Sequence, residues 1–396
     1  MYRLGSLTFQ HSGNMALVLR ALRDEPGLTR SQLAEDLHLD RSTISNLTGA
    51  LIQSGVIREG KSGEAGPRGG RKPISLQINS ERICALGIEI EPEMYRAAVL
   101  DAANRIVFQE ERSLTSAQPL EEIEARAGQI CEELITQGIP IVGVGYGIPG
   151  SVEPPKGRII RSRALAISDL NLRPDLEISL PGDIRTYIPV AVDNDANCCA
   201  LGELHYARQG AAPRDLLFIL ARRTQNHVGV GLGVIIDGHI HYTGGAQTSE
   251  FYTSQWSGDP LSQTSLSHDE LVQSIADTAT WKRLVREILN SVAPIVSVVN
   301  PGVICLGGEF REKMPEIEAL IHQEMSGTYL ESTMSRREFR VSAYGDNEVA
   351  VGAAGMVLER LFSIPHYDRS MDPFRVSWDR VLPLLRHMYG GDLVQT

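Results

Sequence analysis

The chain has 396 residues, 42% of them hydrophobic and 22% charged, a composition typical of globular proteins with two or three domains. It holds no run of about 18 uninterrupted apolar residues, which argues against a membrane span, and residues 1–14 lack the pattern of a secretion signal. The five cysteines form no C-x-x-C pair. We therefore expect buried thiols in a reducing, cytoplasmic setting, with neither disulfides nor a zinc site.

The formal net charge of −11 is unevenly distributed along the chain. Residues 1–80 hold 10 basic and 7 acidic side chains, so the remainder holds 28 basic and 42 acidic ones. A mildly basic head joined to an acidic body indicates a nucleic-acid-binding module attached to a part that does not bind nucleic acid.

The head has the helical pattern of a helix-turn-helix domain. A first helix with apolar residues at helical spacing is expected to end before Pro26, and Thr29 is predicted to cap a second helix over 30–37. A third helix is predicted over 41–52, with Ile44, Leu47, Leu51 and Ile52 in its buried stripe. The early residues of this helix that lie off the stripe are predicted to contact DNA: Arg41, Ser42, Thr43, Ser45 and Asn46.

Two predicted strands, at 56–57 and 74–78, flank a glycine-rich basic segment. Its Arg68, Arg71 and Lys72 are predicted to enter a narrow minor groove, where the negative potential favours cationic side chains. Alone, this segment is equally typical of a solvated linker. After three short helices it favours a winged helix-turn-helix.

The rest of the chain alternates strands with helices, which predicts an α/β body with two sheets of related design. Helices are predicted over 120–137 and 349–358, and another amphipathic helix around 378–385 is expected to cover the core or a subunit interface. Strands are predicted over 85–91, 96–101, 105–108, 141–148, 188–192, 215–220, 228–236 and 303–306.

The segment 193–203 holds the clearest candidate site of the body. It follows the apolar strand at 188–192, and the carboxyl end of such a strand is where α/β proteins bind ligands. Asn194 and Asp195 can bind hydroxyl groups there, and Asp195 can also serve as a general base. A helix N-cap is the alternative for a single aspartate. Four polar residues in five positions favour a binding site.

From about Gly87 to Arg360 the body resembles the ROK family of repressors and sugar kinases. The similarity rests on the stretches 145–150, 193–203, 229–238, 300–308 and 352–354, and the head resembles that of the family's repressor branch. The resemblance implies an α/β chain with an N-terminal winged helix-turn-helix and a two-lobed, actin-like ATPase/hexokinase-type fold. It also implies a sugar pocket formed by Asn194, Asp195, Glu250 and Gly150, with Asp195 at the position of the kinases' catalytic base.

On this basis four regions are predicted. Residues 1–80 form the DNA-binding domain, 81–192 the first lobe, 193–345 the second lobe, and 346–396 the C-terminal helices that return to the first lobe, plus a tail.

Departures from the family's kinases indicate that this chain lacks their reaction. The phosphate-binding D-x-G-G-T of the kinases corresponds here to 89–93, which has no glycine or threonine and whose extra carboxylates would repel a triphosphate. Val228 replaces a second phosphate-site threonine. The family's zinc motif is absent after Glu250, and Ala164 and Ile167 replace an asparagine and a tryptophan of sugar-binding members. We expect no catalytic residue, cofactor or metal.

The sequence thus predicts a sugar-responsive DNA-binding transcriptional regulator, a repressor of carbohydrate-utilisation genes without kinase activity. Its expected partners are operator DNA, a sugar effector and a second copy of the chain, in a homodimer or higher homo-oligomer. Three alternatives stay open: an ATP-dependent sugar kinase with a regulatory DNA-binding head, a regulator whose body docks a protein partner, and an activator.

Overall fold

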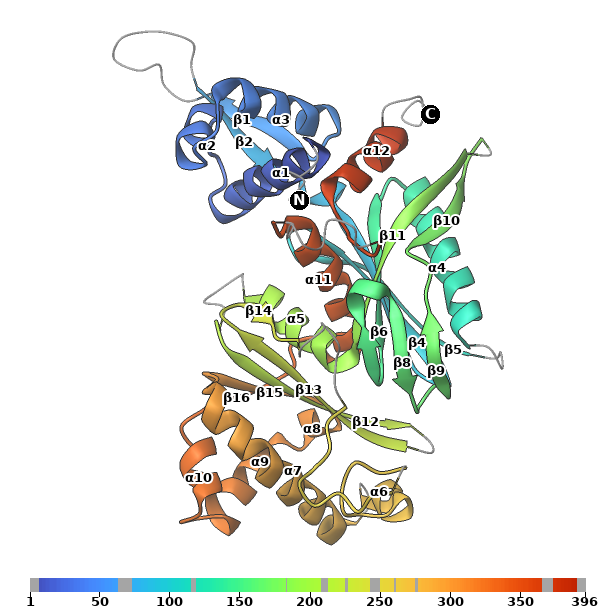
Figure 1. Ribbon diagram of the computed structural model, residues 1–396, viewed down its shortest axis with the longest axis vertical. Helices are drawn as coiled ribbons and strands as arrows, with labels where there is room; N and C mark the ends of the chain where they lie inside the picture. Colours follow the sequence, from blue (N-terminus) through green and yellow to red (C-terminus); the bar gives the residue numbers. More distant parts are fainter. Residues whose placement is uncertain are drawn as a thin grey trace, which may run out of the picture.

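The computed structural model describes residues 7–62, 73–114, 119–182, 184–207, 213–224, 227–242, 250–259, 261–274, 277–364 and 373–389. A small head sits above a first sheet, and a second sheet lies at the opposite end (Figure 1). Arg68, Arg71 and Lys72 of the predicted wing lie outside the described residues. Within the described ranges, no helix combines the length and hydropathy of a membrane span.

The head consists of three helices and a two-stranded antiparallel sheet. Thr29 begins the second helix as predicted, because its hydroxyl accepts from the Gln32 amide at 3.4 Å while the Gln32 side chain accepts from the Thr29 amide at 2.9 Å. Of the predicted stripe, Ile44, Leu47 and Leu51 are buried and Ile52 is half-buried. The elements are α1 (Leu7–Asp24), α2 (Arg30–Asp36), α3 (Arg41–Gln53), β1 (Ile57–Ser62) and β2 (Ile74–Ile78).

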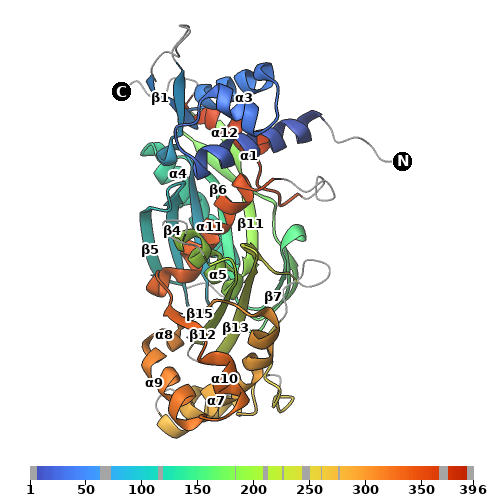
Figure 2. The same cartoon turned by 90° about the vertical axis from the view of Figure 1, so that its left-hand side faces the viewer.

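The first sheet has six strands in the order β10-β11-β6-β3-β4-β5. One face carries α4 (Pro119–Thr136) and the other α11 (Glu348–Phe362), and α12 (Trp378–Tyr389) joins this layer to the head (Figures 1 and 2). The η1 turn (Ser80–Arg82) leads into the sheet. The strands are β3 (Cys84–Ile90), β4 (Met94–Asp101), β5 (Ile106–Ser113), β6 (Ile141–Ile148), β10 (Asp175–Leu180) and β11 (Ile184–Asn194).

A small antiparallel sheet follows β6, and its polar strands were not predicted from the sequence. It contains β7 (Ser151–Glu153), η2 (Pro154–Lys156), β8 (Arg158–Ser162) and β9 (Ile167–Asn171). The second large sheet has the order β14-β13-β12-β15-β16, with α5 (Asp195–Ala207) on the face toward the first sheet. Its strands are β12 (Leu216–Thr224), β13 (His227–Ile236), β14 (His239–Ile240), β15 (Val303–Gly308) and β16 (Glu338–Val341).

The outer face of the second sheet is covered by a layer of helices. Helix α7 is long, and the other helices of this layer are short. These elements are α6 (His268–Ser274), α7 (Thr278–Val299), α8 (Glu309–Glu312), α9 (Met314–Ala319), η3 (Leu320–Glu324) and α10 (Tyr329–Met334). The η4 turn (Gly345–Asn347) leads into α11 and contacts β4 and β15. Residues of β12 alternate between two cores: Leu216, Phe218 and Leu220 face α5, and Leu217 and Ile219 face the helical layer. This double burial explains why β12 is a continuous apolar run.

The backbone of helix α11 lies very close to the backbone of neighbouring elements on two sides. A Cβ atom on Gly145 of β6 would lie 2.2 Å from the Ala353 carbonyl oxygen, and one on Gly87 of β3 would lie 2.0 Å from that of Ala350. On its other side, a Cβ on Gly352 would lie 1.8 Å from the Cys198 carbonyl oxygen in α5. The backbones of α11, the first sheet and α5 therefore touch, which fixes α5 relative to both.

This close approach predicts that Gly352→Ala destabilises the fold. The added methyl group meets backbone rather than a flexible side chain, so we expect a loss of at least about 2 kcal/mol in the free energy of unfolding, measured by urea denaturation. Gly128→Ala in α4 is the matched control, because no atom lies within 4 Å of its added Cβ. The control is expected to be neutral or to stabilise by up to about 1 kcal/mol. Equal stability of the two variants would contradict this packing.

Candidate functional site

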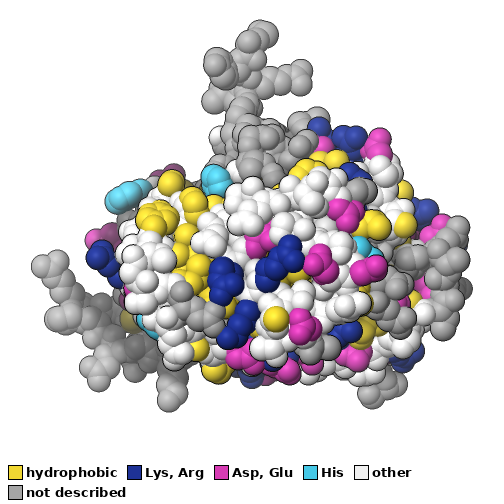
Figure 3. Space-filling model, turned by 90° about the horizontal axis from the view of Figure 1, so that it is seen from below, with side chains coloured by type: hydrophobic (Ala, Val, Ile, Leu, Met, Phe, Trp, Pro, Cys, Tyr) yellow, Lys and Arg dark blue, Asp and Glu magenta, His cyan; other side chains and the backbone are white. Residues whose placement is uncertain are grey.

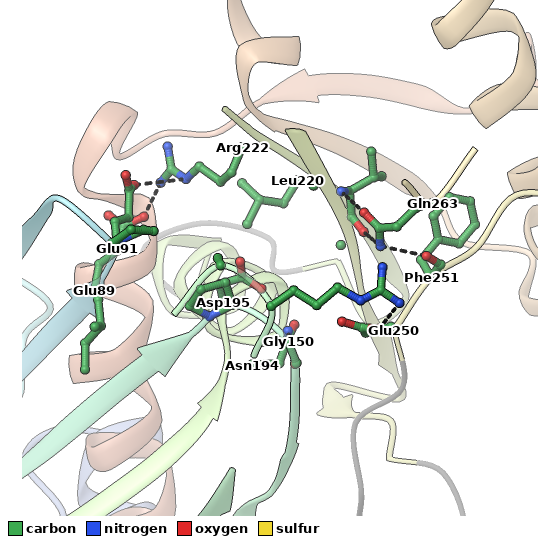
Figure 4. Close-up of a pocket in the computed structure, with 18 residues that line it drawn as sticks. Glu89, Glu91, Gly150, Asn194, Asp195, Leu220, Arg222, Glu250, Phe251 and Gln263 are labelled. Carbon is green, nitrogen blue, oxygen red and sulfur yellow. Dashed lines mark hydrogen bonds and ion pairs between the residues drawn. The ribbon is translucent and has the colours of Figure 1, made fainter. Parts of the chain in front are cut away.

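A cleft lies between the two large sheets, and it brings together the residues predicted for sugar binding (Figure 4). Gly150, Asn194, Asp195 and Glu250 all line it, although they come from segments up to 100 positions apart. Of the two positions noted as departures from the family, Ala164 lines the cleft and Ile167 does not.

Asn194 occupies the turn from β11 into α5 and organises it. Its Nδ2 donates to the Gly150 carbonyl oxygen at 2.8 Å, and its Oδ1 accepts from the Ala196 amide at 3.0 Å. The helix-capping alternative is therefore correct for Asn194. The side-chain amide of Asn194 also holds the Gly150 turn at the cleft wall. This residue therefore both caps α5 and positions part of the candidate site.

Asp195 is the first residue of α5 and projects into the cleft (Figure 4). One of its oxygens accepts from the Ala196 amide at 2.8 Å. Burial raises the pKa of Asp195 to about 6, although the Ala196 amide and the charge of Arg222 act in the opposite direction. Asp195 is thus poised to accept from or donate to a ligand hydroxyl near neutral pH.

Asp193, one residue before Asn194, does not line the cleft. Its carboxylate is fully buried, where it accepts from the Asn197 side chain at 2.8 Å and from the Tyr242 hydroxyl at 2.5 Å. Burial raises the pKa of Asp193 above its usual range. Of the two aspartates in this segment, one supports the fold and the other faces the cleft.

Glu250 lies on the opposite wall and has two partners that the sequence did not reveal. Arg163, in the turn between β8 and β9, places Nη2 3.3 Å from Glu250 Oε2. The Tyr252 hydroxyl donates to the same oxygen at 2.7 Å and accepts from Arg163. The sequence analysis did not identify Arg163 as a site residue, although its neighbour Ala164 was compared with the sugar-binding members of the family.

An ionic cluster lies at the end of the cleft formed by 89–93, the segment that the sequence analysis compared with the phosphate-binding motif of kinases. Arg222 of β12 lies 2.8 Å from Glu89 and 3.4 Å from Glu348, while Arg96 of β4 lies 3.1 Å from Glu91. Glu89 and Glu348 are 2% and 1% exposed. The sequence argument expected the carboxylates of this segment to repel a triphosphate, and this stays a prediction. The structure adds that Glu89 and Glu91 are paired with arginines, Glu89 with Arg222 across the lobes and Glu91 with Arg96.

Burial dominates the electrostatics of this cluster. It raises the pKa of Glu89 and of Glu348, while the nearby Arg222 opposes the shift in both. Glu348 also accepts from the Gly308 amide at 2.7 Å, so the start of α11 is tied to the end of β15. Among the described residues, no group of three or more His, Cys, Asp and Glu side chains is arranged to hold a metal ion.

The predicted DNA-contacting residues of α3 lie on one accessible face. Arg41, Ser42, Ser45 and Asn46 are exposed and Thr43 is half-buried. Figure 2 shows α3 at the end of the molecule away from the second sheet. The opposite end, seen from below in Figure 3, mixes basic with acidic and hydrophobic side chains, unlike the continuous basic surface typical of nucleic-acid binding.

Two protein families match parts of this chain. Residues 85–251 match the ROK family, and residues 17–58 match the winged helix-turn-helix DNA-binding family. These matches cover part of the head, including α2 and α3, and the cleft-lining residues between Glu89 and Phe251.

Known proteins with similar sequences include two xylose repressors. The chain is 26% identical to that of Caldicellulosiruptor bescii over 241 residues, which are 60% of this chain and 57% of that protein. It is 22% identical to that of Bacillus subtilis over 393 residues, 90% of this chain and 98% of that protein. The match to the first relative thus spans little more than half of its length.

A solved ROK family transcriptional regulator, described as a homologue of the Escherichia coli MLC protein, has the same architecture. It aligns with a TM-score of 0.66 at 16% identity, over 97% of this chain and 100% of that one. At this identity the likeness shows the fold. The predicted fold, a winged helix-turn-helix followed by a two-lobed sugar-kinase-like body, is confirmed.

The raised pKa of Asp195 predicts a pH-dependent cost to stability. Because the folded chain holds this proton more tightly than the unfolded chain, whose pKa is near 3.8, Asp195 lowers stability as the pH rises from about 4 to about 6. Asp195→Asn removes this cost. We expect the stability of the variant relative to wild type to increase by about 1–2 kcal/mol between pH 4.5 and 7.5, measured by urea denaturation.

Asp237→Asn is the control, because that aspartate is 72% exposed on a turn. Its stability difference from wild type is expected to stay constant over the same pH range. Parallel pH profiles for Asp195→Asn and wild type would contradict the burial of this carboxylate.

Proposed function

We propose that this chain is a sugar-responsive transcription regulator that represses carbohydrate-utilisation genes, because residues 85–251 match the ROK family and residues 17–58 match a winged helix-turn-helix DNA-binding family. The observation that carries the proposal is the convergence of Gly150, Asn194, Asp195 and Glu250 on one cleft, in a chain whose helix α3 also exposes most of the residues predicted to contact DNA. Its relatives named xylose repressors make xylose the first effector to test.

We assign DNA contact to α3 and the wing, and sugar contact to the cleft. The working division of the chain is 1–80 for the DNA-binding domain, 81–192 and 193–345 for the lobes, and 346–396 for the returning helices and tail. Two copies in a cytoplasmic homodimer would present two heads to a two-fold operator.

Helix α11 provides a physical connection between the cleft and the head. It starts at Glu348 in the ionic cluster and ends beside α1, where the Arg23 guanidinium lies 4.7 Å from the centre of the Phe362 ring and 3.8 Å from Glu359. A sugar that binds the open and closed clefts with different affinity would shift α11 and hence the head.

The absence of kinase activity is part of this proposal, supported by the ionic cluster at 89–93. Phosphoryl transfer depends on backbone and cationic groups that are free to hold phosphates. Here Arg222 and Arg96 are engaged by Glu89, Glu91 and Glu348. The kinase alternative is favoured by one observation, the position and raised pKa of Asp195, which suit a general base.

A thermal-shift screen of the full chain tests the sensor. Xylose and other monosaccharides are expected to raise the melting temperature of wild type and not of Asp195→Ala, because ligand binding stabilises the native state by mass action. ATP with Mg²⁺ is expected to have no effect. An ATP shift with sugar-dependent ADP formation that is lost in Asp195→Ala would establish the kinase. No shift with any sugar, together with a co-purifying protein, would favour the docking alternative.

DNA binding is tested on a duplex selected from a random-sequence pool by the purified chain. The double variant Arg68→Ala, Arg71→Ala is expected to weaken binding and to lower the salt slope by up to about one per lost phosphate contact. Asn46→Ala is expected to cost about 1–3 kcal/mol and to relax preference at one base pair. Arg185→Ala in the body, 75% exposed, is the control for loss of one positive charge. An unchanged slope in the wing variant would remove the wing from the interface.

A further inference from the structure

Arg163 has hydrogen-bonding capacity in the cleft that the described residues do not use. Its side chain is 12% exposed, and only Nη2 has partners, Glu250 and Tyr252. Its Nε and Nη1 atoms are buried and have no hydrogen-bond partner among the described residues. A guanidinium remains charged at all physiological pH values, and leaving its buried N–H groups unpaired is unfavourable.

The other arginine of the cleft is in a different situation. Arg222 also has two buried nitrogens, Nε and Nη2, without a hydrogen-bond partner among the described residues. However, Glu89, Glu348 and Glu91 lie within 4.0 Å of its nitrogens, so carboxylates of the chain itself neutralise its charge. Arg163 has one carboxylate, Glu250, and this approaches a single nitrogen. The remaining donors of Arg163 therefore suit acceptor oxygens brought by a ligand.

The chemistry around Arg163 favours a carboxylate over a neutral hydroxyl as that acceptor. A carboxylate has acceptor oxygens only, and its hydrogen bonds to a guanidinium are charge-assisted and hence stronger than those of a hydroxyl. The acidic groups at the far end of the cleft are already paired with Arg222 and Arg96. Asp195, whose pKa is raised to about 6, can accept a proton when an anion binds nearby.

We propose that the effector is a sugar acid, a monosaccharide derivative whose carboxylate binds Arg163 while its hydroxyls face Asp195 and the Gly150 turn. This inference rests on the proposed sugar-sensing function and narrows its ligand class. Arg163 is then the residue that determines specificity, and Glu250 and Tyr252 orient its guanidinium. A phosphate dianion is less suited to the site, because it would carry a second negative charge beside Glu250.

Matched pairs of ligands test this assignment on the full chain. Xylose with xylonate, glucose with gluconate or glucuronate, and galactose with galacturonate are compared by thermal shift and calorimetry, with glucose 6-phosphate as the phosphate probe. For at least one pair, wild type is expected to bind the acid at least tenfold more tightly than the neutral sugar. Arg163→Gln is expected to abolish this preference, and Arg163→Lys to retain part of it because the charge remains.

Arg161→Gln is the control, because Arg161 is an exposed neighbour in β8 that does not line the cleft. It removes the same charge and is expected to keep the preference. Tighter binding of the neutral sugars or of glucose 6-phosphate by wild type would overturn the sugar-acid assignment and leave the sensor intact. A preference that survives in Arg163→Gln would also overturn it. No binding of any sugar or sugar acid would instead refute the proposed function itself.

Discussion

The arrangement of the body depends on the ion pairs that Arg222 makes across the cleft. The guanidinium belongs to the second sheet, and its partners Glu89 and Glu348 belong to the first sheet and to the helix that covers it. Taking these charges out of water is costly, and their mutual attraction offsets the cost only when the groups stay together. The cluster therefore penalises arrangements of the two lobes that separate these charges.

The second constraint is the set of short backbone contacts along α11. This helix connects the cleft with the head. Gly145 and Gly352 let its backbone touch the sheet on one side and α5 on the other. Helix α5 starts at the cleft with Asp195, and α11 ends at Phe362 against Arg23 of the head. A packed interior of this kind does not deform gradually. A change in the cleft is thus expected to move α5 and α11 together and to reach the head as a displacement.

Local sequence rules predicted the parts of this structure that depend on local causes. The Thr29 cap, the buried stripe of α3 and the polar end of β11 follow from spacing and side-chain chemistry. The small sheet β7–β9 was missed because its strands are short and polar, so they have no hydrophobic periodicity to detect. The resemblance to a known family, rather than periodicity, selected Glu250, since its distance from Asp195 along the chain gives no indication that the two share a cleft.

What the sequence could not supply is the pairing of charges. Arg163, Arg222 and Glu348 are separated by more than 50 positions from one another, and each resembles an ordinary surface residue in its local context. Only the fold shows that Arg222 is surrounded by carboxylates of its own chain while Arg163 is not. The two arginines share a cleft and a charge, and they differ in the number of carboxylates of the chain that lie beside them. On our proposal, Arg222 therefore holds the two lobes together, and Arg163 binds the carboxylate of a ligand.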